Sequence, residues 1–249
     1  MSSPFELILK SVRLYRTNAA TFLGYSAWLL IPFAGAVILG LLPLSPFAQL
    51  LAFLLMLVEL FLSFWVVIIL VLCADALLTG KKFEHGRFPK IAKTLIAPVL
   101  TVALLQTLIL IGGLLLLVVP GFLFFVWFSF AQFTAILDGK RGLDALQTSK
   151  AMIKGKFWKV FLTIFGGTLF LFIVYSLILS LIMSLIAALQ GVDLLDMLTG
   201  TLPLWIQVLE SIGEVILLPL LVIFLTSVYL EVKSGEVVES KSQSHGVVE

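Results

Sequence analysis

Residues 47–78 read FAQLLAFLLMLVELFLSFWVVIILVLCADALL, and only Glu59 and Asp75 carry charge in this stretch. A helix needs about 20 apolar residues to cross a membrane, within a range of about 17–25. This stretch is longer, so it predicts a spanning helix that tilts or projects into the cytoplasm. Basic connections resist translocation, which places the end of this helix on the cytoplasmic side. The basic residues that follow it are Lys81, Lys82, Arg87, Lys90 and Lys93.

Six apolar segments divide the chain, and the connections between them alternate in their content of basic residues. The predicted spans are residues 20–42, 47–78, 91–118, 121–137, 157–189 and 203–230. All 16 Lys and Arg residues lie before the first span, around the second and fourth connections or after the last span. The sequence therefore predicts an all-α membrane protein with six transmembrane helices in three antiparallel hairpins and both termini in the cytoplasm.

The overall composition is typical of an all-α membrane protein. Of the 249 residues, 61% are hydrophobic and 12% are charged, and the mean hydropathy is +1.19. Soluble domains average about 45–50% apolar and about 25% charged residues. The formal net charge of +2 does not indicate nucleic-acid binding, because the basic residues border the spans, where membrane insertion explains them. Cys73 is the only cysteine, and its apolar surroundings in the sequence predict a packing residue.

Two amphipathic segments and a polar tail accompany the spans, which form one membrane domain over residues 1–232. Residues 3–17 predict an interfacial helix that begins with a capping box formed by Ser3 and Glu6. Its apolar face is predicted to contain Phe5, Ile8, Leu9, Val12 and Tyr15. Residues 142–156 predict a short cytoplasmic amphipathic helix. Residues 233–249 are rich in Ser, Glu and Val without periodicity, which predicts a flexible cytoplasmic tail.

Some residues inside the spans are expected to serve packing. The pairs Gly112-Gly113 and Gly166-Gly167 are predicted to let neighbouring helices approach closely, since small residues are favoured at contacts between membrane helices. Asp75 lies near the cytoplasmic end of its span, where we expect it to face solvent or the two following lysines, Lys81 and Lys82.

The stretch from Pro120 to Phe161 carries a family resemblance. It contains Pro120-Gly121, an aromatic-rich span, Asp138-Gly139-Lys140, Ala145-Leu146-Gln147-Thr148-Ser149-Lys150 and Lys154-Gly155-Lys156-Phe157-Trp158-Lys159-Val160-Phe161. This pattern resembles the membrane-domain family named after bacterial glycerophosphoryl diester phosphodiesterases, and related integral membrane families of unknown function. The resemblance covers about a sixth of the chain and implies a six-helix inner-membrane module with a link to lipid or envelope physiology. Some members carry a soluble phosphodiesterase barrel, which the short cytoplasmic segments here are not expected to hold.

The basic residues near the span ends are predicted to contact lipid headgroups. They are Lys10, Arg13, Arg16, Lys81, Lys82, Lys154, Lys156 and Lys159. Membrane lipids are therefore the expected partners, and a membrane-protein partner or a homo-oligomer remains open. The predicted location is the plasma (cell inner) membrane, which the chain crosses several times.

Five polar side chains lie inside the predicted spans and form a candidate site for a proton, an ion or a headgroup. They are Glu59, Gln106, Gln132, Glu210 and Glu214. With a rise of ~1.5 Å per residue, Glu59 and Glu214 lie ~18 and ~16 Å from the outer ends of their spans, near the middle of a ~30 Å hydrocarbon core. A charged carboxylate at this depth costs at least about 2.5–3.5 kcal/mol. Two arrangements would relieve that cost: protonated carboxyls bonded to the glutamines or to each other, or carboxylates that line a water-filled cavity open to the outer face.

Each arrangement implies a different function. Bonded polar groups would hold helices together in a non-catalytic membrane module with a role in lipid or envelope homeostasis, which is the first hypothesis. Carboxylates in a cavity would serve a small transporter or channel that uses Glu59 and Glu214, which is the alternative. An enzyme is not expected, because the sequence shows no nucleophile–base pair and no residues with metal-ligand spacing. No metal or cofactor is expected.

Overall fold

The computed structural model describes residues 3–43, 45–81, 86–191 and 203–245, and this part of the chain is all-helical. Six of its helical stretches are long and apolar enough to cross a membrane, which confirms the predicted class. They are Ala19–Gly40, Pro46–Thr79, Phe88–Leu115, Val119–Leu137, Phe157–Gln190 and Leu204–Gly235. Each of them overlaps one predicted span over most of its length.

Helix α1 (Pro4–Thr17) begins at the predicted capping box. The Ser3 hydroxyl accepts a hydrogen bond from the Glu6 backbone N–H at 3.2 Å, and the Glu6 carboxylate accepts one from the Ser3 N–H at 3.1 Å. The face that packs against α9 (Phe157–Gln190) and α11 (Leu204–His245) holds the buried residues Leu7, Ile8 and Ser11. Ile8 of the predicted apolar face is therefore buried in the bundle, whereas Phe5 and Leu9 of that face are exposed.

The first predicted span is interrupted by a tighter turn. It consists of α2 (Ala19–Ser26), the 3-10 segment η1 (Ala27–Leu29) and α3 (Leu30–Gly40). Pro32 explains the interruption, because a proline lacks an N–H and its ring clashes with the carbonyl four residues earlier, here that of Trp28. A short 3-10 turn at that place accommodates the proline. The bend leaves α3 packed beside α4 (Pro46–Thr79).

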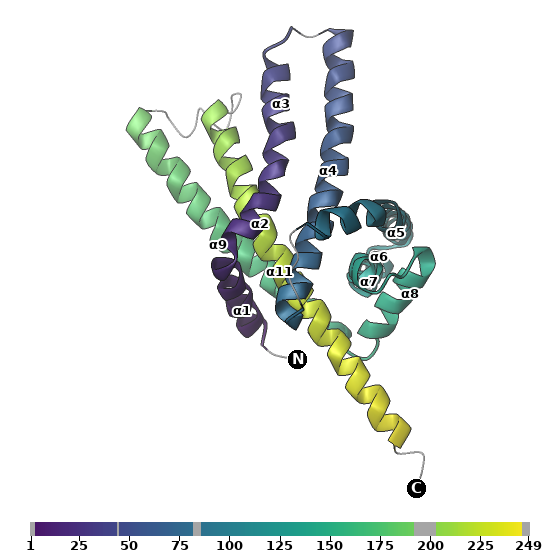
Figure 1. Cartoon of the computed structure of the whole chain (residues 1–249). Helices are drawn as coiled ribbons and strands as arrows, with labels where there is room; N and C mark the ends of the chain where they lie inside the picture. Colours follow the sequence, from purple (N-terminus) through teal and green to yellow (C-terminus); the bar gives the residue numbers. More distant parts are fainter. Residues whose placement is uncertain (1–2, 44, 82–85, 192–202, 246–249) are drawn as a thin grey trace.

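Helix α11 runs through the middle of the molecule (Figure 1). It packs against α1, α2, α3, α4, α8 (Gly142–Ile153) and α9. Its Val222 and Ile223 belong to the same buried cluster as the second half of α4, from Val66 to Ala76. In Figure 1, α3 and the first half of α4 extend on one side, and α9 with the first half of α11 extends on the other. The two groups diverge from this shared buried cluster.

The C-terminal segment differs from the prediction. Helix α11 continues to His245, where the sequence predicted a flexible tail from residue 233. Extending an existing helix by one residue adds a hydrogen bond without the cost of a new nucleus. Residues 230–245 include no proline, so no missing N–H and no ring clash interrupts a helix that the preceding span has already started.

The fourth predicted span, residues 121–137, is broken. Helix α5 (Phe88–Leu116) leads into α6 (Val118–Trp127), and three turn residues separate α6 from α7 (Ala131–Leu137). The Ser149 hydroxyl of α8 accepts a hydrogen bond from the Phe130 N–H at 3.1 Å and donates one to the Trp127 carbonyl at 2.7 Å. Ser149 thus replaces helix hydrogen bonds that the break removes. Figure 1 shows α6 and α7 nearly end-on, so they run across the direction of α3 and α4.

One glycine of each predicted pair permits a close helix contact. A Cβ atom on Gly167 would lie 2.1 Å from Cζ of the fully buried Phe224 in α11, and one on Gly113 would lie 2.6 Å from the Phe124 ring. Nothing lies within 4 Å of a Cβ atom on Gly112 or Gly166. The predicted packing role is therefore confirmed for Gly113 and Gly167 only.

Two carboxylates with largely buried side chains form ion pairs. The Lys81 ammonium lies 2.6 Å from the Asp75 carboxylate, as predicted. Asp138, which follows α7, accepts a hydrogen bond from the Tyr229 hydroxyl at 2.7 Å and pairs with the Lys233 ammonium. The Tyr229 ring packs on Phe133, with ring centroids 5.5 Å apart. Asp138 therefore fastens the α7–α8 connection to α11.

Candidate functional site

A cavity of about 460 Å³ lies between α3, α4 and α11, where the two diverging helix groups begin to separate. Its walls are mostly apolar, and its polar side chains are two glutamates and two serines. The lining residues are Leu29, Pro32, Phe33, Ala36, Glu59, Ser63, Val67, Ser211, Glu214, Val215, Leu217, Leu218 and Leu221.

Helical spacing explains why these residues face one space. Glu59, Ser63 and Val67 follow one another at intervals of four along α4, so they form one stripe. Ser211 and Glu214 are three residues apart on α11 and begin a second stripe. The third wall comes from η1 and α3, beginning at Leu29 and bent by the proline of this segment.

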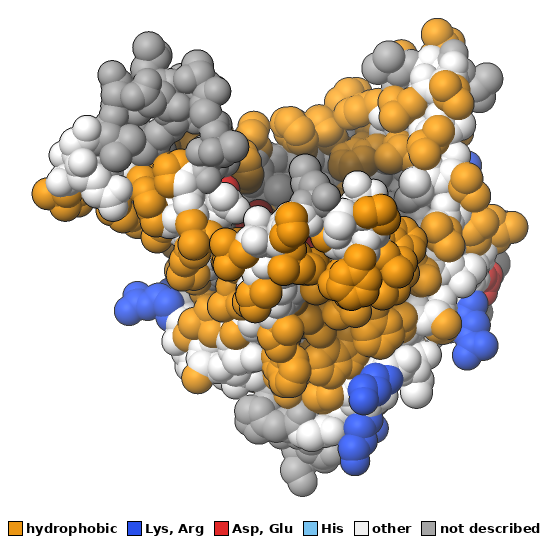
Figure 2. Space-filling view, turned by 90° about the horizontal axis from the view of Figure 1, so that it is seen from above, with side chains coloured by type: hydrophobic (Ala, Val, Ile, Leu, Met, Phe, Trp, Pro, Cys, Tyr) orange, Lys and Arg blue, Asp and Glu red, His pale blue; other side chains and the backbone are white. Residues whose placement is uncertain are grey.

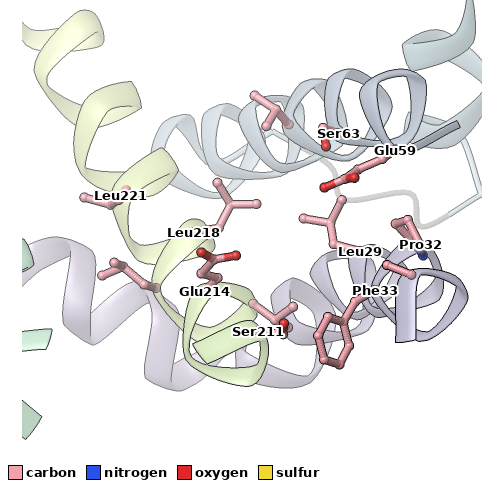
Figure 3. Close-up of a pocket in the computed structure, with 13 residues that line it drawn as sticks. Leu29, Pro32, Phe33, Glu59, Ser63, Ser211, Glu214, Leu218 and Leu221 are labelled. Carbon is pink, nitrogen blue, oxygen red and sulfur yellow. The ribbon is translucent and has the colours of Figure 1, made fainter. Parts of the chain in front are cut away.

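The two carboxylates point into the cavity from different walls (Figure 3). Glu59 comes from α4 and Glu214 from α11, and both side chains are exposed rather than packed in the core. The lining residues, all of which the structure describes, include no lysine, arginine or histidine. Figure 2, which views the molecule from above, shows acidic side chains within a hollow between apolar ones, and basic side chains at the outer edge of the molecule. The cavity is therefore an acidic recess with apolar walls.

The structure divides the predicted polar cluster into separate parts. Gln106 of α5 and Gln132 of α7 lie together, with the Gln132 amide nitrogen 3.5 Å from the Gln106 amide oxygen. Neither glutamine lines the cavity, whose walls come from η1, α3, α4 and α11 and not from α5 or α7. Glu210 is partly buried and also does not line the cavity. The expectation of a single cluster is thus corrected to Glu59 with Glu214 in one place and the glutamines in another.

The residues predicted to contact headgroups lie elsewhere. Most of them are exposed: Lys10, Arg13, Arg16, Lys81, Lys154 and Lys159. Lys156 is partly buried, and Lys82 lies outside the described residues. None of the described ones lines the acidic cavity.

Sequence reasoning missed the two serines and the α3 wall. Ser63 lies four residues after Glu59 and Ser211 three residues before Glu214, so helical spacing alone could have placed both hydroxyls beside the carboxylates. The contribution of Phe33 could not have been found this way, because it depends on how α3 packs against α4. Among the described residues, no three His, Cys, Asp or Glu side chains are grouped so that they could hold a metal ion.

The chain matches no protein-family model, no curated protein and no solved structure. The resemblance of the stretch from Pro120 to Phe161 therefore stays a prediction, and the function is inferred from the cavity.

Proposed function

We propose that this protein is a non-catalytic, multi-pass membrane protein that binds a cationic solute with an apolar body and carries it across the membrane. The observation behind this proposal is the cavity that Glu59 and Glu214 share without a lysine, arginine or histidine in its lining. Of the two hypotheses that the sequence left open, the transporter required carboxylates in an open cavity. The module for lipid or envelope homeostasis required a dry interior with the polar groups bonded to one another.

Electrostatics favour a positively charged ligand. An unpaired carboxylate in the hydrocarbon region costs at least about 2.5–3.5 kcal/mol, and a second one nearby repels the first. A cation between Glu59 and Glu214 offsets both costs. Phe33 lines the same space, and the face of an aromatic ring also attracts cations.

The apolar walls favour an organic cation over a bare metal ion. Leu29, Leu218 and Leu221 line the cavity and offer no ligand atoms for a metal. A metal ion would have to shed water that only two carboxylates and two hydroxyls could replace. An ammonium, guanidinium or phosphonium group attached to an apolar body matches both the charge and the walls of the site.

The proposed orientation follows the distribution of basic residues. With both termini in the cytoplasm, the end of α3 and the beginning of α4 lie on the outer side of the inner membrane. Helix α1 then lies in the cytoplasmic interface, with Leu7 and Ile8 against the bundle and the exposed Arg13 and Arg16 toward the headgroups. The acidic cavity then opens toward the outer face.

The role of the two cavity carboxylates in cation binding is tested by replacing each glutamate with glutamine, which has nearly the same shape and no charge. We expect Glu59→Gln and Glu214→Gln each to weaken binding of tetraphenylphosphonium, a compact lipophilic cation, about tenfold or more, because each removes one charge from the cavity wall. The measurement is equilibrium binding to the purified protein in an uncharged detergent.

Glu210→Gln is the matched control, since Glu210 lies on the same helix one turn from Glu214 but does not line the cavity. We expect this variant to bind the cation within about twofold of the unmodified protein. Equal binding by Glu59→Gln, Glu214→Gln and the unmodified protein would refute the proposed function.

A further inference from the structure

An apolar groove with a volume of about 300 Å³ runs between α9 and the first half of α11. Its walls come from Leu171 to Ile182 on α9 and from Leu209 to Leu220 on α11. Of the described residues that line it, Leu217 alone also lines the acidic cavity. The groove and the acidic cavity therefore lie on different sides of α11.

The groove ends near the cytoplasmic boundary of the membrane. Tyr15 of α1 lines it, and Figure 1 shows α1 beside the lower part of α9. The innermost lining residues of the two walls are Leu171 and Leu220. Along their helices they lie ~28 and ~24 Å from the outer ends at Gln190 and Leu204. In the orientation proposed above, a hydrocarbon core of ~30 Å therefore ends close to Tyr15.

The Tyr15 side chain brings a hydrogen-bond donor to this end of the groove. Its hydroxyl oxygen is buried and bonds to none of the described residues. Its ring lies edge-on to the fully buried Phe22, with ring centroids 6.1 Å apart. Burial raises the pKa of the hydroxyl, so the group stays protonated and can donate. A buried hydroxyl is stabilised by an acceptor, and the ester carbonyls of phospholipids lie at this depth of a membrane.

Positive charge lies beside the same end of the groove. Arg16 follows Tyr15 in the chain and lines, together with Arg13, a hollow of about 460 Å³ on α1. Val12 lines this hollow too and packs against the buried cluster that contains Val160 of α9, so the hollow borders α9. Both arginines are exposed, and no acidic side chain is among the described residues that line the hollow. Guanidinium groups bind phosphate oxygens in pairs.

We propose that α1, α9 and α11 form a binding site for one anionic phospholipid of the cytoplasmic leaflet. Its acyl chain occupies the groove, Tyr15 donates a hydrogen bond to an ester carbonyl, and Arg13 and Arg16 hold the phosphate. Chain, ester and phosphate thus meet apolar walls, a donor and positive charge in the order in which they follow one another in the lipid. Two arginines favour a headgroup with net negative charge over one that carries a choline cation. The site does not depend on the proposed cation binding.

Selectivity for the headgroup is measured by native mass spectrometry of the purified protein. The probes are phosphatidylglycerol and phosphatidylcholine with identical acyl chains. We expect one phosphatidylglycerol per chain, bound about tenfold more tightly than phosphatidylcholine. Arg13→Gln combined with Arg16→Gln should remove this preference. Lys154→Gln combined with Lys159→Gln is the matched control and should keep it, since both lysines are exposed and line neither the groove nor the hollow.

The place of the chain and the ester is measured in the same way. Val174 lines the groove and is 38% exposed, so Val174→Trp should fill the groove and weaken binding of both lipids about tenfold. Phe170→Trp adds an indole elsewhere on α9 and should have no such effect, because Phe170 does not line the groove. Tyr15→Phe keeps the ring without the donor and should weaken both lipids about fivefold. Glycerol phosphate, which has no acyl chain, should not displace the lipid.

Three results would each overturn the proposal. The first is equal binding of the two lipids, or a preference that survives the loss of both arginines. The second is unchanged binding in Val174→Trp or in Tyr15→Phe. The third is a dimer that binds no lipid, which would mean that a second copy of the chain covers the groove. None of these results bears on the acidic cavity, so the proposed function is tested separately.

Discussion

Replacing Gly167 with alanine is expected to destabilise the protein by about 1–3 kcal/mol, because the added methyl group forces packed helices apart. A Cβ atom at this position would lie 2.1 Å from Cζ of Phe224, which is fully buried in α11. The Phe224 ring cannot move aside without displacing its own neighbours. The free energy of unfolding, measured by titration of mixed micelles with dodecyl sulfate, should fall by that amount.

The adjacent glycine provides a matched control. Gly166 lies on the same helix, is exposed and has nothing within 4 Å of an added Cβ atom. Alanine is favoured over glycine in a helix by about 0.8–1.0 kcal/mol, so Gly166→Ala should be neutral or stabilising. If Gly166→Ala and Gly167→Ala had the same effect, the close approach of α9 and α11 at Phe224 would be wrong.

Replacing Asp138 with alanine is expected to cost about 2–3 kcal/mol, because the Tyr229 hydroxyl and the Lys233 ammonium both lose their partner. The Asp138 side chain is only 15% exposed, which makes its ion pair more costly to break than a surface pair. The Lys233 side chain is 42% exposed and can turn to water, which keeps the loss below the 3–5 kcal/mol typical of fully buried pairs. The same mixed-micelle titration measures the loss.

Asp144→Ala is the control for this second prediction. Asp144 pairs with Lys140 at 3.6 Å, and its side chain is 66% exposed. Exposed pairs of this spacing contribute about 0.3–0.5 kcal/mol, so the change should be small. A loss for Asp144→Ala as large as that for Asp138→Ala would contradict the role of Asp138 in fastening the α7–α8 connection to α11.

The spans could be predicted from sequence because their signal is local. The length and hydropathy of a run such as residues 47–78 can be read from that run alone. The helix that the structure shows there, α4 (Pro46–Thr79), begins and ends within one residue of the run. The capping box of α1 is equally local. The break between α6 and α7 is not, because its partner Ser149 lies 19 residues from Phe130 and no glycine or proline marks the three turn residues.

The candidate site could be predicted in part for the same reason. Hydropathy and depth identified Glu59 and Glu214 as unpaired carboxylates near the membrane middle, and the structure places both on one cavity. Gln106 and Gln132 also lie inside predicted spans, yet they meet each other at the contact between α5 and α7. Depth in the membrane gives only one coordinate of a side chain. The direction in which the side chain points also depends on how its helix is rotated about its axis, and that rotation is set by packing that a single sequence does not specify.

The central claim is that the cavity selects for positive charge, and a pair of ions of opposite sign tests it most directly. Tetraphenylphosphonium and tetraphenylborate share the same four-phenyl shape and differ in the sign of their charge. We expect the purified protein in uncharged detergent to bind the cation saturably, with binding at the acidic cavity that depends on Glu59 and Glu214. The anion should show no saturable binding there. Equal saturable binding of both ions, or binding of the anion alone, would contradict the claim.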